Sequence, residues 1–148
     1  MQETLFDRNR DADVRTFVVW FKMYPGDEKS RWPRQLLTDK RVEHRWDEPK
    51  NAGKWFLQRL SNLKPQRGAG PFPQNPEALW DSYLLFDRDG VWNDTPTGLV
   101  SWGYTVMGTR TRLEEDYWYE IGLRKKQREP SVARGFSRAT PRPARPAP

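Results

Sequence analysis

The sequence contains no cysteine and only one histidine, His44. Without thiols the chain has no disulfide, no thiolate nucleophile and no cysteine-ligated zinc or iron–sulfur centre. One imidazole is also too few for a histidine-based metal site. These absences exclude the thiol-dependent classes of function, and we expect no cofactor.

Long hydrophobic runs are absent as well. No stretch approaches the ~20 apolar residues of a membrane-spanning helix. Residues 1–10 mix acids and bases and contain no apolar segment of the kind that marks a secretory signal. We therefore expect a cytoplasmic protein that makes no contact with a membrane.

Aromatic residues are the abundant apolar class. Hydrophobic residues make up only 35% of the chain and the mean hydropathy is −1.01, yet there are eight Trp, seven Phe and five Tyr. Each aromatic side chain can bury a large area, so the polar average does not imply disorder. With 148 residues the chain is long enough for one domain with a substantial core.

The net charge of +6 is unevenly distributed. Eight cations and one acid lie from Arg124 to the end, a charge of +7, which leaves −1 on residues 1–123. The pI of 9.8 therefore describes the tail rather than the body. Residues 127–148 combine Arg and Pro with little apolar bulk, so we expect a disordered tail after a domain of residues 1–126.

The most apolar stretch runs from Val14 to Tyr24. It is continuously apolar from Phe17 to Phe21 and rich in β-branched and aromatic residues, which is typical of a strand buried on both faces. Such strands belong to parallel or mixed sheets covered by helices. The stretch therefore predicts an α/β fold, and Pro25-Gly26 ends the strand.

The remaining pattern predicts a helix end, further helices, two more strands and a final helix. In the final helix an apolar face is expected from Leu113, Tyr117, Trp118 and Ile121. The predicted elements are a helix end in 1–10, a helix at 28–38, an extended piece at 41–46, a helix at 52–60 capped by Asn51, a loop at 64–76, strands at 78–86 and 99–107, and a helix at 110–126 capped by Thr109.

This βα-ββα order resembles the C-terminal two-thirds of a thioredoxin-like domain, and in particular a group of bacterial thioredoxin-fold proteins. The resemblance covers residues 1–123. It rests on Met1-Gln-Glu-Thr-Leu-Phe-Asp, residues 14–24, Trp32-Pro33, Asp39-Lys40-Arg41-Val42, Trp46-Asp47 and Trp80-Asp81-Ser82-Tyr83-Leu84-Leu85-Phe86. It implies a family of thiol redox proteins.

The chain departs from that family in two places. The family begins with a strand that leads into a Cys-x-x-Cys turn, whereas here Met1 already falls within the first helix. Asp81-Ser82 stands where the family has a cis-proline. Because the redox chemistry needs a thiolate, no catalytic residue carries over.

The strand that the resemblance implies would lie at the centre of the sheet, beside the strand of residues 14–24 and the strand that contains Tyr83. Without it that strand has an exposed edge, which invites pairing with another chain. A start upstream of Met1, a decayed remnant and a partner that fills the gap all remain open as explanations.

Several residues are candidates for a functional site. His44 with Glu43 and Asp47 fits a general base, although a solvated histidine is the favoured reading. Asp47 and Asp81 fit either paired acids in a cleft or acceptors of backbone donors, and the second is favoured. Asp87-x-Asp89-Gly90 resembles part of a calcium loop but favours a hairpin turn. The candidate partner-binding residues are Trp46, Asp47, Trp80, Asp81 and Trp92; of the tryptophans, we expect Trp46 and Trp92 to be exposed.

Two functional hypotheses follow. The first is a thioredoxin-like protein without redox cysteines, acting as a non-catalytic interaction module or representing a truncated member of a thiol-redox family. The alternative is a small basic protein that contacts nucleic acid or another polyanion through its C-terminal tail. Its candidate contacts are Arg124, Lys125, Lys126 and Arg128. The sequence argues against an enzyme.

Overall fold

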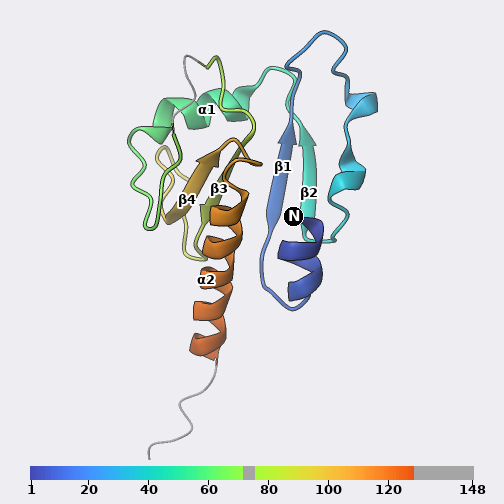
Figure 1. The fold of residues 1–148 in the computed structure, drawn as a ribbon. Coiled ribbons are helices and arrows are strands. Elements are labelled where there is room, and N and C mark those ends of the chain that lie inside the picture. The colour runs from blue at the N-terminus through green and yellow to red at the C-terminus, as the bar shows by residue number, and fades with distance from the viewer. Residues whose placement is uncertain (72–75, 129–148) are drawn as a thin grey trace, which may run out of the picture.

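The computed structural model describes residues 1–71 and 76–128 and has a mixed α/β architecture (Figure 1). Most of the tail expected at 127–148 lies outside the described residues, but residues 127 and 128 belong to the last helix rather than to the tail. The strands and α-helices are β1 (Thr16–Trp20), β2 (Val42–Trp46), α1 (Asn51–Leu60), β3 (Ser82–Phe86), β4 (Leu99–Tyr104) and α2 (Arg110–Arg128).

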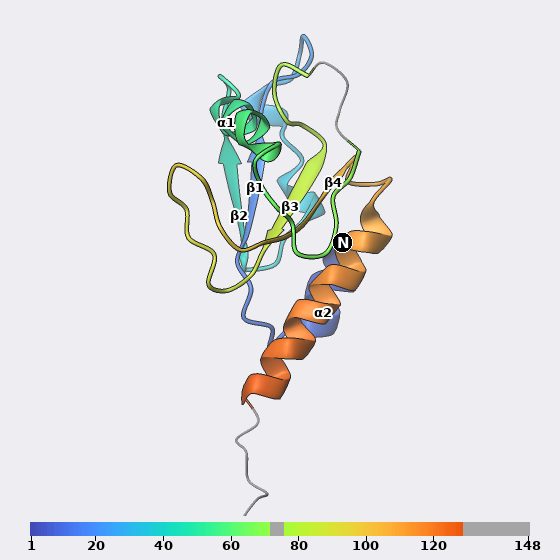
Figure 2. The ribbon, with the colours of Figure 1, turned by 90° about the vertical axis from the view of Figure 1, so that its left-hand side faces the viewer.

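The strands form two separate two-stranded sheets. β1 and β2 are parallel, in a register that joins Thr16 to Val42 and Trp20 to Trp46. β3 and β4 are antiparallel, as the sequence predicts for that pair. Two views at right angles give the spatial order β2, β1, β3, β4 (Figures 1 and 2). In the described part of the chain no ladder joins β1 to β3.

The β3–β4 sheet has a helix on each face. Leu84 and Phe86 pack with a cluster that includes Leu60 of α1, while Tyr83 packs with Leu113 of α2. This arrangement follows from the alternation of side chains along a strand. The centre of the sheet is buried, and Trp102 in β4 is only 1% exposed.

The β1–β2 sheet is covered on one face only. Phe17 is 51% exposed and Val19 is 38% exposed, so the prediction of a strand buried on both faces is wrong. The apolar contacts of α1 go to β3 and β4, which leaves the odd-numbered side chains of β1 without a helix above them. The even-numbered face packs on the segment between β1 and β2, as the contacts of Trp32 with His44 and Trp46 illustrate.

The helix predicted at residues 28–38 is replaced by two 3₁₀ turns, Lys29–Arg31 and Arg34–Leu36. Between them Trp32 is extended, with φ −62° and ψ 134°. The cause is Pro33, because proline disfavours the helical conformation of the residue before it.

The start of α1 also differs from the prediction. Lys50, with a left-handed φ of 61°, precedes the helix, and Asn51 is its first residue rather than its cap. The amide of Ala52 instead donates to Asp47 Oδ2 at 2.7 Å. An acid earlier in the chain therefore satisfies one of the amides that a helix start leaves unpaired.

The last third of the domain keeps its predicted order with changed detail. α2 buries Leu113, Tyr117 and Ile121, but Trp118 is exposed and does not belong to the apolar face. The hydroxyl of Thr109, predicted to cap this helix, donates to the carbonyl of Thr105 at 2.6 Å. The helix end expected in residues 1–10 is a π-turn, Gln2–Phe6, followed by a 3₁₀ turn, Asp7–Asn9.

Candidate functional site

One edge of β1 is occupied by β2. The amide of Thr16 donates to the carbonyl of Arg41 at 2.9 Å, and the amide of Asp47 donates to the carbonyl of Trp20 at 2.7 Å. In a parallel ladder alternate residues direct their backbone groups to the same neighbour. The amides and carbonyls of Phe17 and Val19 therefore point to the opposite edge of β1.

The outer edge of β4 is occupied by residues 66–70, which the sequence predicts as plain loop. The amide of Gly70 donates to the carbonyl of Trp102 at 3.0 Å, and the amide of Trp102 donates to the carbonyl of Gly68 at 3.2 Å. Because the backbone amide and carbonyl of Trp102 face residues 66–70, those of its neighbours Ser101 and Gly103 face β3.

The second edge of β3 follows from this alternation. Tyr83 and Leu85 stand opposite Gly103 and Ser101 and face β4. The backbone groups of Ser82 and Leu84 must then point away from β4. β3, like β1, thus has one edge without a strand partner in the described part of the chain.

The two open edges lie next to each other. β1 and β3 are the inner strands of the four in both views (Figures 1 and 2). The arrows of β1 and β4 point the same way in Figure 1, and β3 is antiparallel to β4, so β3 runs opposite to β1. We define the inner edges as the backbone groups of Phe17 and Val19 on β1 and of Ser82 and Leu84 on β3.

The inner edges are held apart by elements that bridge the two sheets. Leu5 and Phe6 of the N-terminal turn share one apolar cluster with Tyr83, Leu113 and residues of the β1–β2 half. The hydroxyl of Thr4 donates to Glu114 Oε1 at 2.9 Å. The two sheets are therefore positioned by side-chain packing rather than by backbone pairing.

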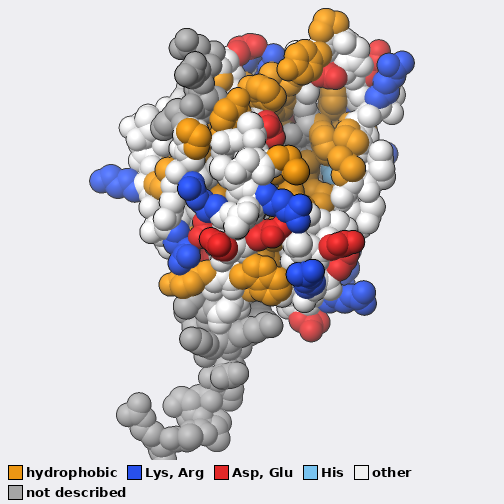
Figure 3. Space-filling view, in the orientation of Figure 1, with side chains coloured by type: hydrophobic (Ala, Val, Ile, Leu, Met, Phe, Trp, Pro, Cys, Tyr) orange, Lys and Arg blue, Asp and Glu red, His pale blue; other side chains and the backbone are white. Residues whose placement is uncertain are grey.

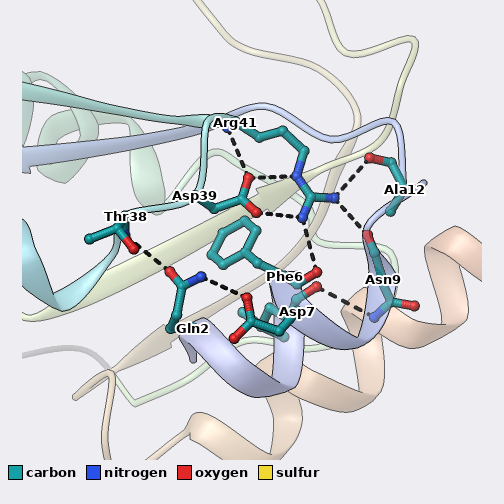
Figure 4. A network of polar contacts seen from close by, with 9 residues as sticks. Gln2, Phe6, Asp7, Asn9, Ala12, Thr38, Asp39 and Arg41 are labelled. Atoms are coloured by element: carbon teal, nitrogen blue, oxygen red, sulfur yellow. Dashed lines mark hydrogen bonds and ion pairs between the residues drawn. The ribbon is translucent and has the colours of Figure 1, made fainter.

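A side-chain network fixes the N-terminal turn to the start of β2 (Figure 4). The guanidinium of Arg41 donates to the carbonyls of Phe6 at 3.0 Å, Asn9 at 2.7 Å and Ala12 at 3.1 Å. The carbonyls of Asn9 and Ala12 also accept backbone amides, from Ala12 at 3.1 Å and from Val14 at 3.0 Å, so the guanidinium adds to these turns. Asp39 accepts from Arg41 at 2.7 Å, and this hydrogen bond lowers the pKa of the Asp39 carboxyl to about 2.

Gln2 adds a second link in the same place. Its amide nitrogen donates to Asp7 Oδ1 at 2.9 Å, and its oxygen accepts from the backbone amide of Thr38 at 3.0 Å (Figure 4). The N-terminal turn thus reaches the segment that leads into β2. These contacts hold the turn against the start of β2, and the chain then runs through residues 10–15 into β1.

Both ring nitrogens of His44 are engaged. Trp20 donates its indole N–H to Nδ1 at 2.9 Å, and Nε2 lies 2.9 Å from the carbonyl of Leu37. Since an indole nitrogen only donates, Nδ1 must be the acceptor and Nε2 carries the proton. The ring is partly buried and stacks on Trp20, so the favoured reading of a solvated histidine is wrong, and the geometry gives no free base.

An open pocket of about 620 Å³ lies over the same face of β2. Figure 3 views the molecule in the orientation of Figure 1 and shows apolar side chains gathered above a band of mixed charge. Polar side chains from both 3₁₀ turns, the segment before β2 and β2 itself line the pocket beside apolar ones. It is lined by Ser30, Trp32, Arg34, Gln35, Leu37, Thr38, Asp39, Val42 and His44.

The two Trp-Asp pairs have local roles. Trp46 packs edge-on against Trp32 and is half-buried rather than exposed, while Asp47 accepts from the start of α1. Trp80 packs edge-on against Tyr104, and Asp81 Oδ1 accepts the amide of Val106 at 3.2 Å. Both acids accept backbone donors, which agrees with the favoured prediction for them.

Trp92 is 57% exposed, as predicted, and belongs to a separate aromatic group. It stacks on Trp55 with an angle of 8° between the rings and contacts Phe56 and Phe86. This group lies in the β3–β4 half of the molecule. The five candidate partner-binding residues are therefore divided between the two halves, and their contacts do not unite them in one surface.

The remaining candidates lack the geometry of a site. The amide of Asp89 donates to Asp87 Oδ1 at 3.0 Å, which confirms a turn here. It is not a tight hairpin turn between the strands, because β4 begins only at Leu99. Within residues 1–71 and 76–128 there is no group of three or more side chains suited to hold a metal ion. The side chains of the candidate polyanion contacts lie outside the described ones, although their backbone belongs to the end of α2: Arg124, Lys125, Lys126 and Arg128.

Sequence reasoning missed a buried polar contact under α2. Asp116 is buried and accepts from Arg67 Nε at 2.6 Å. Tyr83 and Ser101 are buried nearby on β3 and β4, and burial raises the pKa of the Tyr83 hydroxyl. The signal was available, because Asp116 lies beside Tyr117 and three residues after Leu113, on the face predicted to be apolar.

Comparison with known proteins gave no relative: no family model, no curated protein and no solved structure matches the chain. None of the helices in the described residues is long and apolar enough to cross a membrane.

Proposed function

We propose that this chain is a non-catalytic protein-interaction module with a thioredoxin-like arrangement, and that it binds a partner polypeptide through the open edge of β1. The single observation that carries the proposal is the pair of inner edges on β1 and β3. Unpaired strand edges are a template for pairing with another chain. Proteins that bind by strand addition use such edges.

The thioredoxin-like part of the proposal is supported by the order and direction of the elements. A helix end leads into β1, an antiparallel pair follows, and α2 closes the domain. The inner edges also lie where the resemblance would place its central strand. β2, which pairs in parallel with the other side of β1, is compatible with this arrangement.

The non-catalytic part rests on the chemistry of the side chains. There is no thiol for redox exchange. The one imidazole uses both nitrogens in hydrogen bonds to Trp20 and Leu37. The candidate acids Asp47 and Asp81 accept backbone amides.

Amide hydrogen exchange of the full chain, read by NMR, tests the proposal. We expect the amides of Phe17, Val19 and Leu84 to exchange rapidly, because no strand bonds them. The amides of Val18 and Leu85 serve as controls within the same strands, since they face β2 and β4, and should be protected. Protection of Phe17 and Val19 in the monomer would show that the edge is already closed, and the proposal would fail.

A second candidate is polyanion binding through the basic C-terminus. The continuous helix α2 carries four cations over its last five residues, Arg124 to Arg128. Clustered cations bind phosphate backbones by releasing condensed counterions, so the affinity should fall steeply with salt. Titration with a DNA duplex at two salt concentrations tests this, with a chain in which these four cations are replaced by glutamine as comparison. Undiminished binding by that chain would exclude these cations as the contact.

A further inference from the structure

We propose that the pocket lined by the two 3₁₀ turns and β2 binds a small, planar apolar molecule that carries one negative charge, such as an aromatic carboxylate. This site is separate from the open edge of β1, so it goes beyond the proposed function and does not depend on it. Three features of the pocket support the assignment: its volume, its apolar wall and a single charge without an opposite partner.

The apolar wall of the pocket comes from three half-buried side chains. Trp32 lies between the two 3₁₀ turns, Leu37 follows the second turn, and Val42 begins β2. The volume of about 620 Å³ falls within the range of pockets that take small organic molecules. Because an indole ring packs well against another aromatic ring, the wall favours a ligand with a flat aromatic body.

The wall is held in place by contacts within the protein. The ring of Trp32 packs edge-on against His44 and Trp46, with ring centroids 6.3 Å and 6.1 Å apart. Leu37 and Val42 pack against the apolar cluster of the N-terminal turn and α2. Binding to side chains that are already ordered costs less free energy than binding to side chains that must first be ordered.

The charge of the pocket comes from Arg34. Two of the lining residues carry a charge, Arg34 and Asp39. Both carboxyl oxygens of Asp39 accept from the guanidinium of Arg41, at 2.7 Å and 2.9 Å, so this acid is already paired. His44 accepts at Nδ1 and donates at Nε2, and it is therefore neutral in this arrangement.

The guanidinium of Arg34 is both positioned and available. Its Cζ atom lies 4.9 Å from the centre of the Trp32 ring, beside the apolar wall. Within the described part of the chain no acid or carbonyl accepts a hydrogen bond from this exposed side chain. A guanidinium can bind a carboxylate through two parallel hydrogen bonds. An aromatic carboxylate would therefore satisfy the wall and the charge together.

Other classes of ligand fit less well. A cation would meet the charge of Arg34 and would find Asp39 already paired. A multiply charged anion would find one guanidinium in the lining, and the acid Glu28 lies close by, since it accepts from Ser30 at 3.2 Å. No group of three side chains suited to hold a metal ion occurs in residues 1–71 and 76–128.

The probes for a test are 2-naphthoate and 2-naphthamide, which have the same shape and differ in charge. Their binding to the full chain is followed by the shifts of backbone amide signals in NMR spectra. We expect naphthoate to shift the signals of Gln35, Thr38 and Val42 saturably, with a Kd on the order of 1 mM. Naphthamide should bind about five- to tenfold more weakly. Equal binding of the two probes would overturn the preference for an anion.

A matched pair of variants assigns that preference to one side chain. Arg34→Gln should reduce the affinity for naphthoate to that for naphthamide and leave the affinity for naphthamide unchanged. Arg31→Gln is the control, because Arg31 is an exposed arginine of the other 3₁₀ turn and does not line the pocket. Both changes are at exposed positions, so both chains should fold. An equal loss of naphthoate binding in the two variants would overturn the role of Arg34.

The same spectra separate this site from its rivals. Saturable shifts at Trp92 with none at Gln35 and Thr38 would place the probe on the exposed aromatic group and overturn the assignment. Rapid amide exchange of Val19 without probe binding would refute the pocket and keep the proposed function. Protection of Val19 in the free monomer, together with charge-dependent binding at Gln35 and Thr38, would refute the open edge and keep the pocket.

Discussion

The two halves of this molecule are built from similar pieces but differ in how they are completed. The β3–β4 sheet has helices on both faces and residues 66–70 along its outer edge, and Trp102 at its centre is almost fully buried. The β1–β2 sheet is covered on one face and leaves half of Phe17 exposed. The difference indicates that stability is concentrated in the β3–β4 half, whereas the surface available for new contacts lies in the β1–β2 half.

The contrast has a simple physical origin. A two-stranded sheet is marginal alone and becomes stable when it packs against helices. In the β3–β4 half α1 and α2 provide that packing. In the β1–β2 half the N-terminal turn, with the hydrogen bonds of Arg41, covers one face only. The apolar surface that remains is adjacent to the inner edge of β1.

The largest expected effect on the free energy of unfolding comes from a change in the core of the β3–β4 half. Trp102→Ala should lower the free energy of unfolding by about 3–5 kcal/mol, because it leaves a large cavity between β4 and α1. Phe17→Ala should cost about 1 kcal/mol or less, because that side chain is already half in water. Urea unfolding of both variants measures this. Similar costs would mean that the two halves do not differ as we describe.

A close approach inside the same half gives the second prediction. A side chain at Gly103 would collide with Tyr83 and Thr109, so Gly103→Ala should cost about 1–3 kcal/mol. Gly122→Ala is the matched control, since nothing lies near the added carbon in α2 and alanine favours a helix. We expect the control to raise the melting temperature. A Gly103→Ala variant as stable as the original chain would indicate looser packing of β4 against Tyr83 and Thr109.

The anchoring of the N-terminal turn should matter less, but measurably. Arg41→Met keeps much of the length of the side chain and removes the donors to the carbonyls of Phe6, Asn9 and Ala12. We expect a loss of about 1–3 kcal/mol in the free energy of unfolding. Arg15→Met is a control at an exposed arginine of the same half. An equal effect of the two changes would show that the network in Figure 4 does not hold the turn.

The smallest expected effect is on the pH dependence of stability at acid pH. The pKa of Asp39 is lowered to about 2 in the folded chain by its hydrogen bond to Arg41. Its stabilising contribution is therefore present above the ordinary carboxyl pKa of about 4 and is lost as the pH falls from there to about 2. Stability measured between pH 5 and pH 2 should fall less steeply for Asp39→Asn. Identical slopes would contradict the assigned pKa.

Much of the element order could be predicted from the sequence, because apolar runs and turn residues are local signals. β1, β2 and the β3–β4 pair lie within the predicted stretches. The exposure of Phe17 and Val19 could not be predicted, since it depends on which sheet α1 covers. The break in the predicted helix at Pro33 could have been predicted, because proline restricts the conformation of the residue before it.

The candidate site could be predicted from the sequence only in part. The resemblance implied a gap beside both the strand of residues 14–24 and the strand of Tyr83. The pairing of residues 66–70 with the outer edge of β4 could not be predicted, because those residues carry no strand pattern. The role of Arg41 involves carbonyls about 30 residues away in sequence, and such contacts leave no periodic signal. Nor could sequence assign both nitrogens of His44 to structural hydrogen bonds.

The most direct test of the central claim is amide exchange of Val19 in the full chain, with Val18 as the control in the same strand. We predict that the amide of Val19 exchanges rapidly, because it faces the open edge of β1, and that the amide of Val18, which faces β2, is protected. Equal protection of the two amides in the monomer would contradict an open edge on β1.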